Sequence, residues 1–255
     1  TGSAVAAVPA QGQDWAFISS GTWSIVGALS DEVKTTEEAY ITRICNELTL
    51  DSLFLARNIM GLWLLQQSRA AWQRAGSSYS YEELVALAAQ APPGGPLVFP
   101  DHLSFLAPPD MPAAICEFCR RTGQTPPDGP AAVTRCILES LALSYREALE
   151  HMASILDRSF AVIHIVGGGS QNTLLCQLTA DATGIPVLAG PVEATVAGNV
   201  LVQGLACGDL SSPSEIRQVV RASSELREYT PSRGEAWDDR YAEYLAIVVR
   251  SKDLQ

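Results

Sequence analysis

Hydrophobic and polar positions alternate over the first thirty residues in the way expected of β-strands. Three β-rich segments follow one another, at residues 3–8, 15–19 and 22–29. Between the last two, Ser20 and Gly21 are the small residues that a tight hairpin turn favours. The pattern predicts a small antiparallel meander, followed by a polar link over residues 30–38.

The pattern becomes helical from about Leu53 to Arg74, where apolar residues recur on one face. Asn58 and Gln66 are eight residues apart in this segment, with Leu62 midway, so both amides would project from one side of a helix. Further helices are predicted at residues 81–90, 112–121 and 131–156, with a loop rich in proline and glycine at residues 91–100.

The last third of the chain alternates between strand and helix patterns. Residues 161–166 form a nearly continuous apolar run, which is typical of a strand covered on both faces. Gly167, Gly168 and Gly169 interrupt it, and a helix is predicted at residues 172–183, with Gly184 as its C-cap. A short strand at residues 187–189 and helices at residues 194–207, 215–222 and 237–249 follow. This order predicts an α/β fold, a mixed sheet with helices on its faces.

Composition and charge narrow the function classes. With 255 residues, 47% of them hydrophobic, the chain can build one large core or two small ones. Its 17 basic and 28 acidic side chains give a net charge of −11, which argues against a nucleic-acid partner because phosphate backbones require basic patches. No apolar stretch approaches the roughly 20 residues of a membrane span. We therefore expect a cytoplasmic protein without a membrane or nucleic-acid partner.

The six cysteines predict free thiols. Cys116 and Cys119 form a single CxxC pair, whereas a zinc site would require a second pair of ligands. Cys136 lies on the next predicted helix, and a contact between it and Cys119 stays open, with or without a disulfide.

The three consecutive glycines are the strongest chemical signal. They follow a buried strand and precede a helix, so a ligand can approach the main chain where no Cβ intervenes. The N–H groups at the helix start then suit a phosphate or a nucleotide edge. A tight strand-to-helix turn is the simpler alternative, but three glycines exceed what a turn requires. Asn172 excludes both GxGxxG and the GxSxG nucleophile motif, and no lysine follows as in a Walker loop. His164, inside the strand, is interpreted as a core residue.

Three weaker signals accompany the glycines. The turn at residues 19–23 carries hydroxyl and N–H donors that suit a phosphate, although such turns are common. Asn58 and Gln66 are helix amides, which are more often solvated than bound to ligands. Residues 190–199 are rich in Gly, Ala and Thr, and we interpret them as a place where a helix packs closely on the sheet.

Taken together, four segments resemble the FGGY carbohydrate kinases, and within that family most closely the rhamnulokinases. The segments are SSGTWS (19–24), NIMGLWLLQ (58–66), HIVGGGSQNTLLCQLTADATGIPV (164–187) and AGPVEATVAGN (189–199). The resemblance implies the actin/hexokinase-type ATPase fold, with a ribonuclease H-like core. It implies that residues 1–255 form the family's carboxy-terminal, nucleotide-binding domain.

The resemblance also implies roles for single residues. Thr22 corresponds to a hairpin residue that contacts ATP phosphates, Gln66 to a nucleotide-contacting amide, and Gly168 to the glycine beside the adenosine. Asn58 corresponds to a position associated with the sugar, and Thr1 would border it. The remaining residues implied for the adenosine pocket are Gly167, Gly169, Gln171 and Asn172, and no residue is implied as a metal ligand.

For an intact enzyme, the resemblance implies transfer of the γ-phosphoryl group of ATP, with Mg²⁺, to the C1 hydroxyl of a ketose, most closely L-rhamnulose. The family's base, an Asp, is expected just before Thr1, and an amino-terminal domain that holds most of the sugar site is expected to be missing. We therefore expect the chain alone to be inactive and prone to self-association. The family's Asn-Glu-Gly-Gly-like loop reads Asn46-Glu47-Leu48-Thr49 here, which leaves the exact sugar open.

Two other function classes are weighed against this one. A non-catalytic, actin-like nucleotide-binding module would bind ATP without any dependence on sugar. A Rossmann oxidoreductase would require GxGxxG, and an acidic residue at the end of the strand at residues 187–189, and the chain has neither.

Overall fold

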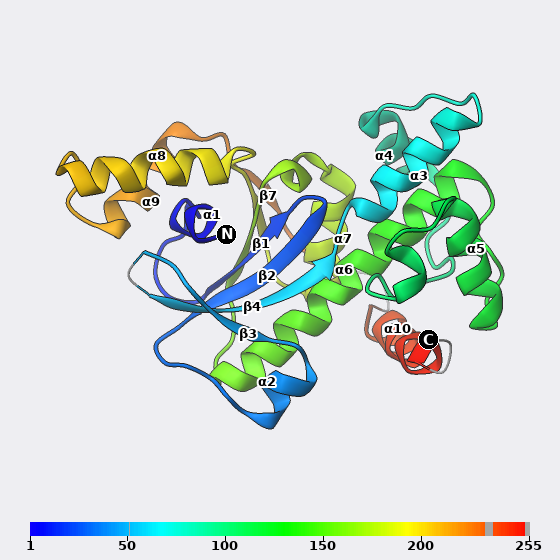
Figure 1. Cartoon of the computed structure of the whole chain (residues 1–255), viewed down its shortest axis with the longest axis horizontal. Coiled ribbons are helices and arrows are strands. Elements are labelled where there is room, and N and C mark those ends of the chain that lie inside the picture. Colours follow the sequence, from blue (N-terminus) through cyan, green and yellow to red (C-terminus); the bar gives the residue numbers. More distant parts are fainter. Residues whose placement is uncertain (51, 233–236, 253–255) are drawn as a thin grey trace.

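A seven-stranded mixed sheet crosses the centre of the molecule in the computed structural model, which describes residues 1–50, 52–232 and 237–252 (Figure 1). The strand order is β3-β4-β2-β1-β5-β6-β7. The strands β3, β4, β2 and β1 pair antiparallel with one another in that order. The strands β1, β5 and β6 run parallel, and β7 pairs antiparallel with β6. The strands are β1 (Trp15–Ser20), β2 (Trp23–Ser30), β3 (Cys45–Leu48), β4 (Leu53–Met60), β5 (Val162–Val166), β6 (Val187–Ala189) and β7 (Arg227–Tyr229).

Helices cover both faces of the sheet, and each face has its own apolar core. The larger core lies under α6 (Gly129–Leu156), with α7 (Thr173–Thr183), α10 (Trp237–Lys252) and the short α2 (Glu37–Ile41) around it. The smaller core lies on the other face, under α1 (Gly2–Ala6), α8 (Ala194–Cys207) and α9 (Pro213–Ser223). Alternate residues of the central strands point into the two cores, so these strands are buried on both sides.

A helical insertion follows β4 and extends the molecule beyond one end of the sheet (Figure 1). It contains α3 (Trp63–Arg74), α4 (Tyr81–Gln90), the short helix η1 (Leu103–Phe105) and α5 (Met111–Arg121). Caps fix where two of these helices begin. Ser80 and Glu83 form a reciprocal capping box at the start of α4, and Asp110 accepts a hydrogen bond from Ala113 N at the start of α5.

The first predicted strand is wrong. Residues 3–8 were predicted to be extended, but residues 2–6 form helix α1, which packs beneath α8. Positions 4–8 are all buried, so the apparent alternation does not separate a core face from a solvent face. The alanines in the segment favour a helix once both sides are covered.

The predicted helix over residues 53–74 is wrong in its first half. Residues 53–60 form strand β4, which lies between β2 and β3 and is buried on both faces, and the helix begins only at Trp63. A mostly apolar run that contains only Arg57 and Asn58 as polar residues fits either structure, and Gly61 marks the break between them. A Cβ on Gly61 would lie 2.5 Å from Ser24 Oγ, so this position has no room for a side chain. Asn58 and Gln66 therefore do not share a helix face.

The other predicted elements are confirmed to within a few residues, whereas α2, β3 and β7 were not predicted. The loop expected at Asn46-Glu47-Leu48-Thr49 is mostly strand β3. Asn46 anchors it by exchanging two hydrogen bonds of 2.8 Å with the backbone of Lys34. The helix expected directly after the glycines begins at Thr173, because residues 168–171 first form the short helix η2 (Gly168–Gln171).

Cys119 and Cys136 are both buried free thiols, and a hydrogen bond joins them between α5 and α6. None of the helices in the described part of the chain has the length and apolar character needed to cross a bilayer.

Candidate functional site

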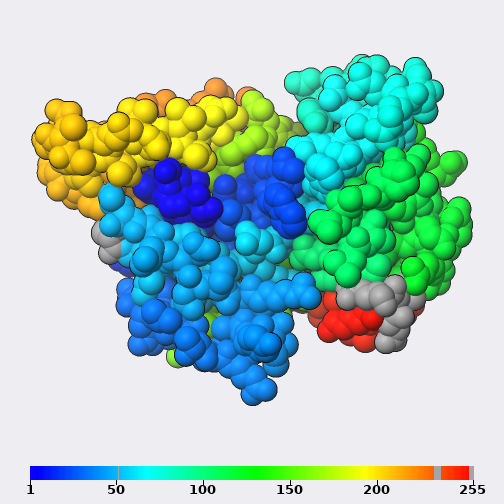
Figure 2. All heavy atoms as spheres, viewed as in Figure 1, coloured from blue at the N-terminus to red at the C-terminus, as the bar shows by residue number. Residues whose placement is uncertain are grey.

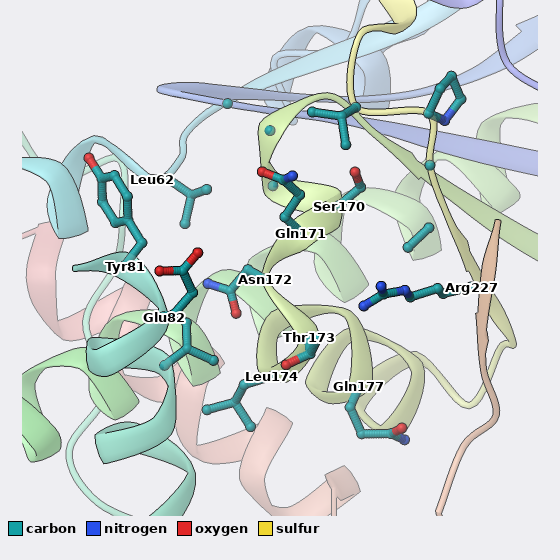
Figure 3. A pocket seen from close by; sticks show the side chains of 18 of the residues that line it. Leu62, Tyr81, Glu82, Ser170, Gln171, Asn172, Thr173, Leu174, Gln177 and Arg227 are labelled. Carbon is teal, nitrogen blue, oxygen red and sulfur yellow. The ribbon is translucent and has the colours of Figure 1, made fainter. Parts of the chain in front are cut away.

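A cavity of about 1220 Å³ opens where the sheet, η2 and the helical insertion meet. In Figure 3, Gln171 and Asn172 lie at its centre, Tyr81 and Glu82 stand on one side, and Arg227 stands on the other. Its floor is the glycine turn and the first turn of α7. The residues that line it are Gly21, Leu62, Leu65, Gln66, Tyr81, Glu82, Val85, Ala86, Ala89, residues 168–174, Gln177, residues 189–192, residues 223–225 and Arg227.

The three glycines after β5 have different surroundings. A Cβ on Gly169 would lie 2.0 Å from Ser20 Oγ, and a Cβ on Gly167 would lie 2.9 Å from Ser20 O. Gly167 also has a φ of +84°, which L side chains rarely adopt. A Cβ on Gly168 would meet no atom within 4 Å, and Gly168 lines the cavity. Gly167 and Gly169 are therefore required by packing against the end of β1, whereas Gly168 leaves the floor of the cavity open.

The β1–β2 hairpin and helix α3 are joined directly. Leu62 N and Trp63 N donate hydrogen bonds of 3.0 and 3.1 Å to the carbonyl oxygens of Gly21 and Thr22. Thr22 Oγ1 also donates to Gln66 Oε1 at 3.1 Å. The structure thus brings Thr22 and Gln66 together, although they belong to different elements; Gln66 lines the cavity, whereas Thr22 is not among the lining residues.

Gln171 and Asn172 lie in the same short segment but differ in their environment. Asn172 is buried and its Oδ1 accepts a hydrogen bond from Leu175 N at 3.0 Å, so it is the N-cap of α7. Its amide nitrogen stays directed into the cavity, toward Glu82 (Figure 3). Gln171 is exposed within the cavity.

Charges of both signs are present at the rim. Arg227 on β7 is the one cation among the lining residues, and its Nη2 lies 3.7 Å from Glu225 Oε1. Glu82 contributes a carboxylate from α4. Apart from Tyr81 and Glu82, the α4 side is apolar, with Val85 and Ala89 lining the cavity, and Leu65 of α3 lines it beside them.

Asn58 and Thr1 lie outside this cavity. Asn58 is exposed on β4, opposite Ile25, and its side chain is on the sheet face that carries α1 and α8. Thr1 is exposed and precedes α1. Next to it, Thr49 Oγ1 donates a hydrogen bond of 3.3 Å to Gly2 O, so the segment that departs from the family pattern lies against the start of α1.

His164 is confirmed as a core residue. It is buried, and its ring meets Trp15 edge-on with 6.1 Å between centroids. Burial, with Arg221 and Arg217 nearby, lowers the pKa of His164 to about 4, so the ring stays neutral. As for metals, the described residues hold no group of three or more His, Cys, Asp or Glu side chains suited to binding an ion.

The family follows from comparison with known proteins. Residues 16–207 match the model of the C-terminal domain of the FGGY family of carbohydrate kinases. The chain belongs to this family. Among curated FGGY kinases, a rhamnulokinase from Bacteroides thetaiotaomicron is 42% identical over 249 residues, which are 97% of this chain and 50% of that protein. A rhamnulokinase from Pectobacterium carotovorum is 40% identical over 232 residues, 91% of this chain and 46% of that protein.

Solved FGGY kinases share the fold at much lower identity. A xylulose kinase from Rhodospirillum rubrum has a TM-score of 0.73 and 18% identity over 99% of this chain and 50% of its own. A Plasmodium falciparum glycerol kinase, solved with ADP, has a TM-score of 0.63 and 13% identity over 99% of this chain and 49% of its own. The fold is therefore the actin/hexokinase type, and the chain spans about half the length of the curated relatives it matches.

Sequence reasoning missed two walls of the cavity. The α4 wall contains no polar motif, so nothing in its sequence distinguishes it from an ordinary amphipathic helix. The opposite wall, at residues 190–192 and 223–227, depends on the pairing of β7 with β6, and a three-residue edge strand gives almost no periodic signal. The segment at residues 190–199 was interpreted as a place where a helix packs closely on the sheet; the close packing is present, but α8 packs on α1, and residues 190–192 line the cavity. A Cβ on Gly198 would lie 1.8 Å from Ser3 O.

Proposed function

We propose that the cavity binds ATP, with the adenosine on the glycine turn and the phosphates toward the β1–β2 hairpin. The observation that carries this proposal is the open space above Gly168, on the floor of a cavity large enough for a nucleotide, in a chain of a kinase family. The apolar side chains of α4 suit the faces of a purine base. Asn172 and Gln171 supply amides for its edge.

The phosphate end of the proposed site is built from the hairpin. A small turn offers main-chain N–H groups, and the Thr22 hydroxyl, which donates to Gln66 Oε1 at 3.1 Å, would turn that proton to a phosphate oxygen on binding. Mg²⁺, when bound, would neutralise phosphate charge.

For an intact kinase we propose ATP-dependent phosphorylation of a ketose at its C1 hydroxyl, giving the sugar 1-phosphate and ADP. The support for L-rhamnulose as the sugar is the 40–42% identity to two proteins named rhamnulokinase. We place Asn58 and Thr1 toward the sugar and assign the general base, an Asp, to residues outside these 255. Such an enzyme acts where ATP is made and used, in the cytoplasm.

Nucleotide binding is tested with Gly168→Asp. The new side chain would occupy the cavity floor and place a negative charge beside the nucleotide, so we expect ADP binding, measured by calorimetry, to be lost. Gly95→Asp is the matched control, because a Cβ there also meets no atom within 4 Å but lies outside the cavity. Unchanged ADP affinity in Gly168→Asp would refute the proposed site.

Sugar phosphorylation is tested by comparing this chain with a longer protein that carries it together with an amino-terminal domain. We expect no phosphorylation of L-rhamnulose, L-fuculose, xylulose or glycerol by the 255 residues, because the sugar is neither held nor deprotonated. The longer protein should turn over ATP only with one ketose. A comparable rate from the chain alone would overturn the assignment of the base, and ATP turnover without sugar dependence would favour the non-catalytic module.

A further inference from the structure

A buried tyrosine lies directly beneath the β1–β2 hairpin. Tyr145, on α6, is fully buried, and its hydroxyl lies 2.7 Å from Ser24 Oγ on β2. The hydroxyl of Ser20, at the end of β1, is close to the same phenol. Burial raises the pKa of Tyr145 to about 12, so the phenol keeps its proton. The three hydroxyls therefore form a small neutral cluster between α6 and the sheet.

The two serines mark the two ends of the hairpin turn. Ser20 and Ser24 are directly opposite each other in the β1–β2 register, and only residues 21–23, including Thr22, lie between them. Both serines are buried on the face that meets α6. A group that bonds to Ser24 and lies close to Ser20 on this face fixes the base of the turn that carries Thr22.

The other walls of the proposed nucleotide site meet at the same two serines. The glycine turn packs on Ser20, where Gly169 leaves no room for a Cβ. The junction between β4 and α3 packs on Ser24, where Gly61 leaves no room for one either, and α3 carries Gln66. The hairpin, the glycine turn and α3 thus share one buried contact point, and Tyr145 supports it from α6.

We propose that the Tyr145 hydroxyl is a positioning group for the nucleotide phosphates, which holds the Ser20–Ser24 pair so that Thr22 faces the glycine turn. The inference rests on the proposed ATP site and adds to it a residue that does not touch the ligand. Without the phenol oxygen, Ser24 loses a buried hydrogen-bond partner, and the hairpin turn is free to shift relative to the floor of the cavity. The adenosine end, which rests on η2 and α4, keeps its shape.

The experiment compares adenosine with ADP by calorimetry on the 255-residue chain. In Tyr145→Phe we expect adenosine affinity to stay within about twofold and ADP affinity to fall about tenfold, because only ADP uses the hairpin. Tyr244→Phe is the matched control. It removes another fully buried phenol hydroxyl, on α10, away from the cavity lining, and it should change neither affinity.

A second variant tests the same bond from its other end and keeps the test informative if Tyr145→Phe folds poorly. Ser24→Ala should reproduce the selective loss of ADP affinity, and the double variant should lose little more than either single one, because both remove one interaction. Additive losses of ADP affinity in the double variant, or a ratio of ADP affinity to adenosine affinity equal to that of the wild type, would overturn the inference. Neither result would contradict the proposed nucleotide site. If the unsubstituted chain bound neither ligand, the proposed function would fail and the inference with it.

Discussion

Gly168 and Gly169 are neighbours in the chain, yet one faces an open cavity and the other presses on the side chain of Ser20. The run of glycines therefore combines two requirements that a sequence cannot separate. Close packing needs Gly167 and Gly169, and an unobstructed floor needs Gly168. The tight-turn interpretation holds for Gly167 and Gly169, whereas the ligand interpretation stays a prediction for Gly168.

His164 makes stability depend on pH. Its pKa of about 4 in the folded chain lies below the ordinary value of 6.5, so the unfolded chain takes up the proton first as pH falls. The fold therefore loses stability between about pH 6.5 and pH 4. Between pH 7 and pH 5 we expect the wild type to lose about 2 kcal/mol more unfolding free energy than His164→Phe, measured in urea. Parallel pH profiles for the two proteins would contradict this.

The single-residue assignments that came from sequence depend on family resemblance more than on residue chemistry. Thr22 and Gln66 are far apart in the chain, and no periodicity predicts their contact of 3.1 Å, which arises because α3 docks on the hairpin carbonyls. The amide pair inferred from helical spacing, Asn58 with Gln66, is separated by the break at Gly61. Only the three consecutive glycines indicated a candidate site by their residue type alone.

Among the elements, those with a strong period, a clear cap or a continuous apolar run were predictable, whereas α1 and β4 were not. The predicted range for α4 agrees with the structure because its polar and apolar faces alternate and Ser80 caps it, and the range for α6 agrees although residues 133–145 are all buried. α1 and β4 failed for one reason. Each is short and mostly buried, so the hydrophobic pattern contains too few exposed polar positions to distinguish the period of a helix from that of a strand.

The contact between α1 and α8 can be tested with two alanines in one helix. Gly198→Ala puts a methyl group 1.8 Å from Ser3 O, so the helices must separate, and we expect a loss of about 1–3 kcal/mol of unfolding free energy. Gly204→Ala meets only the Leu210 side chain at 3.9 Å and should stabilise by about 0.5–1 kcal/mol, because alanine favours the helix. Equal effects of the two substitutions in thermal unfolding would show that the close approach is not limiting.

Across the whole molecule, the cavity draws on segments from Gly21 to Arg227, and the sheet order brings them together. The α/β class with a mixed sheet followed from the order of elements, even though the first of the three predicted antiparallel strands is helix α1 and strand β4 was predicted as helix. The cavity walls did not follow, because a short edge strand and an insertion helix carry no signal of where they will lie. Figure 2 shows α8 at the surface beside α1.

An exposed apolar strip on α8 predicts that the whole chain self-associates. Val196 and Val200 are one helical turn apart on α8 and are 58% and 61% exposed, which leaves an apolar strip uncovered. We expect sedimentation to show concentration-dependent association of the 255-residue chain. A Val196→Glu, Val200→Glu double variant should reduce that association, because burying two carboxylates is costly. A strictly monomeric wild type at high concentration would rule this out.

The contact between Ser20 and Gly169 also constrains how such sequences can diverge. A methyl group at position 169 requires the space of the Ser20 hydroxymethyl group, so a larger residue at 169 becomes tolerable only after position 20 has shrunk to glycine. Evolution would have to pass through the smaller residue first, which gives the two substitutions a fixed order. Across kinases with this turn, positions 20 and 169 should therefore vary as a pair, although 149 positions separate them.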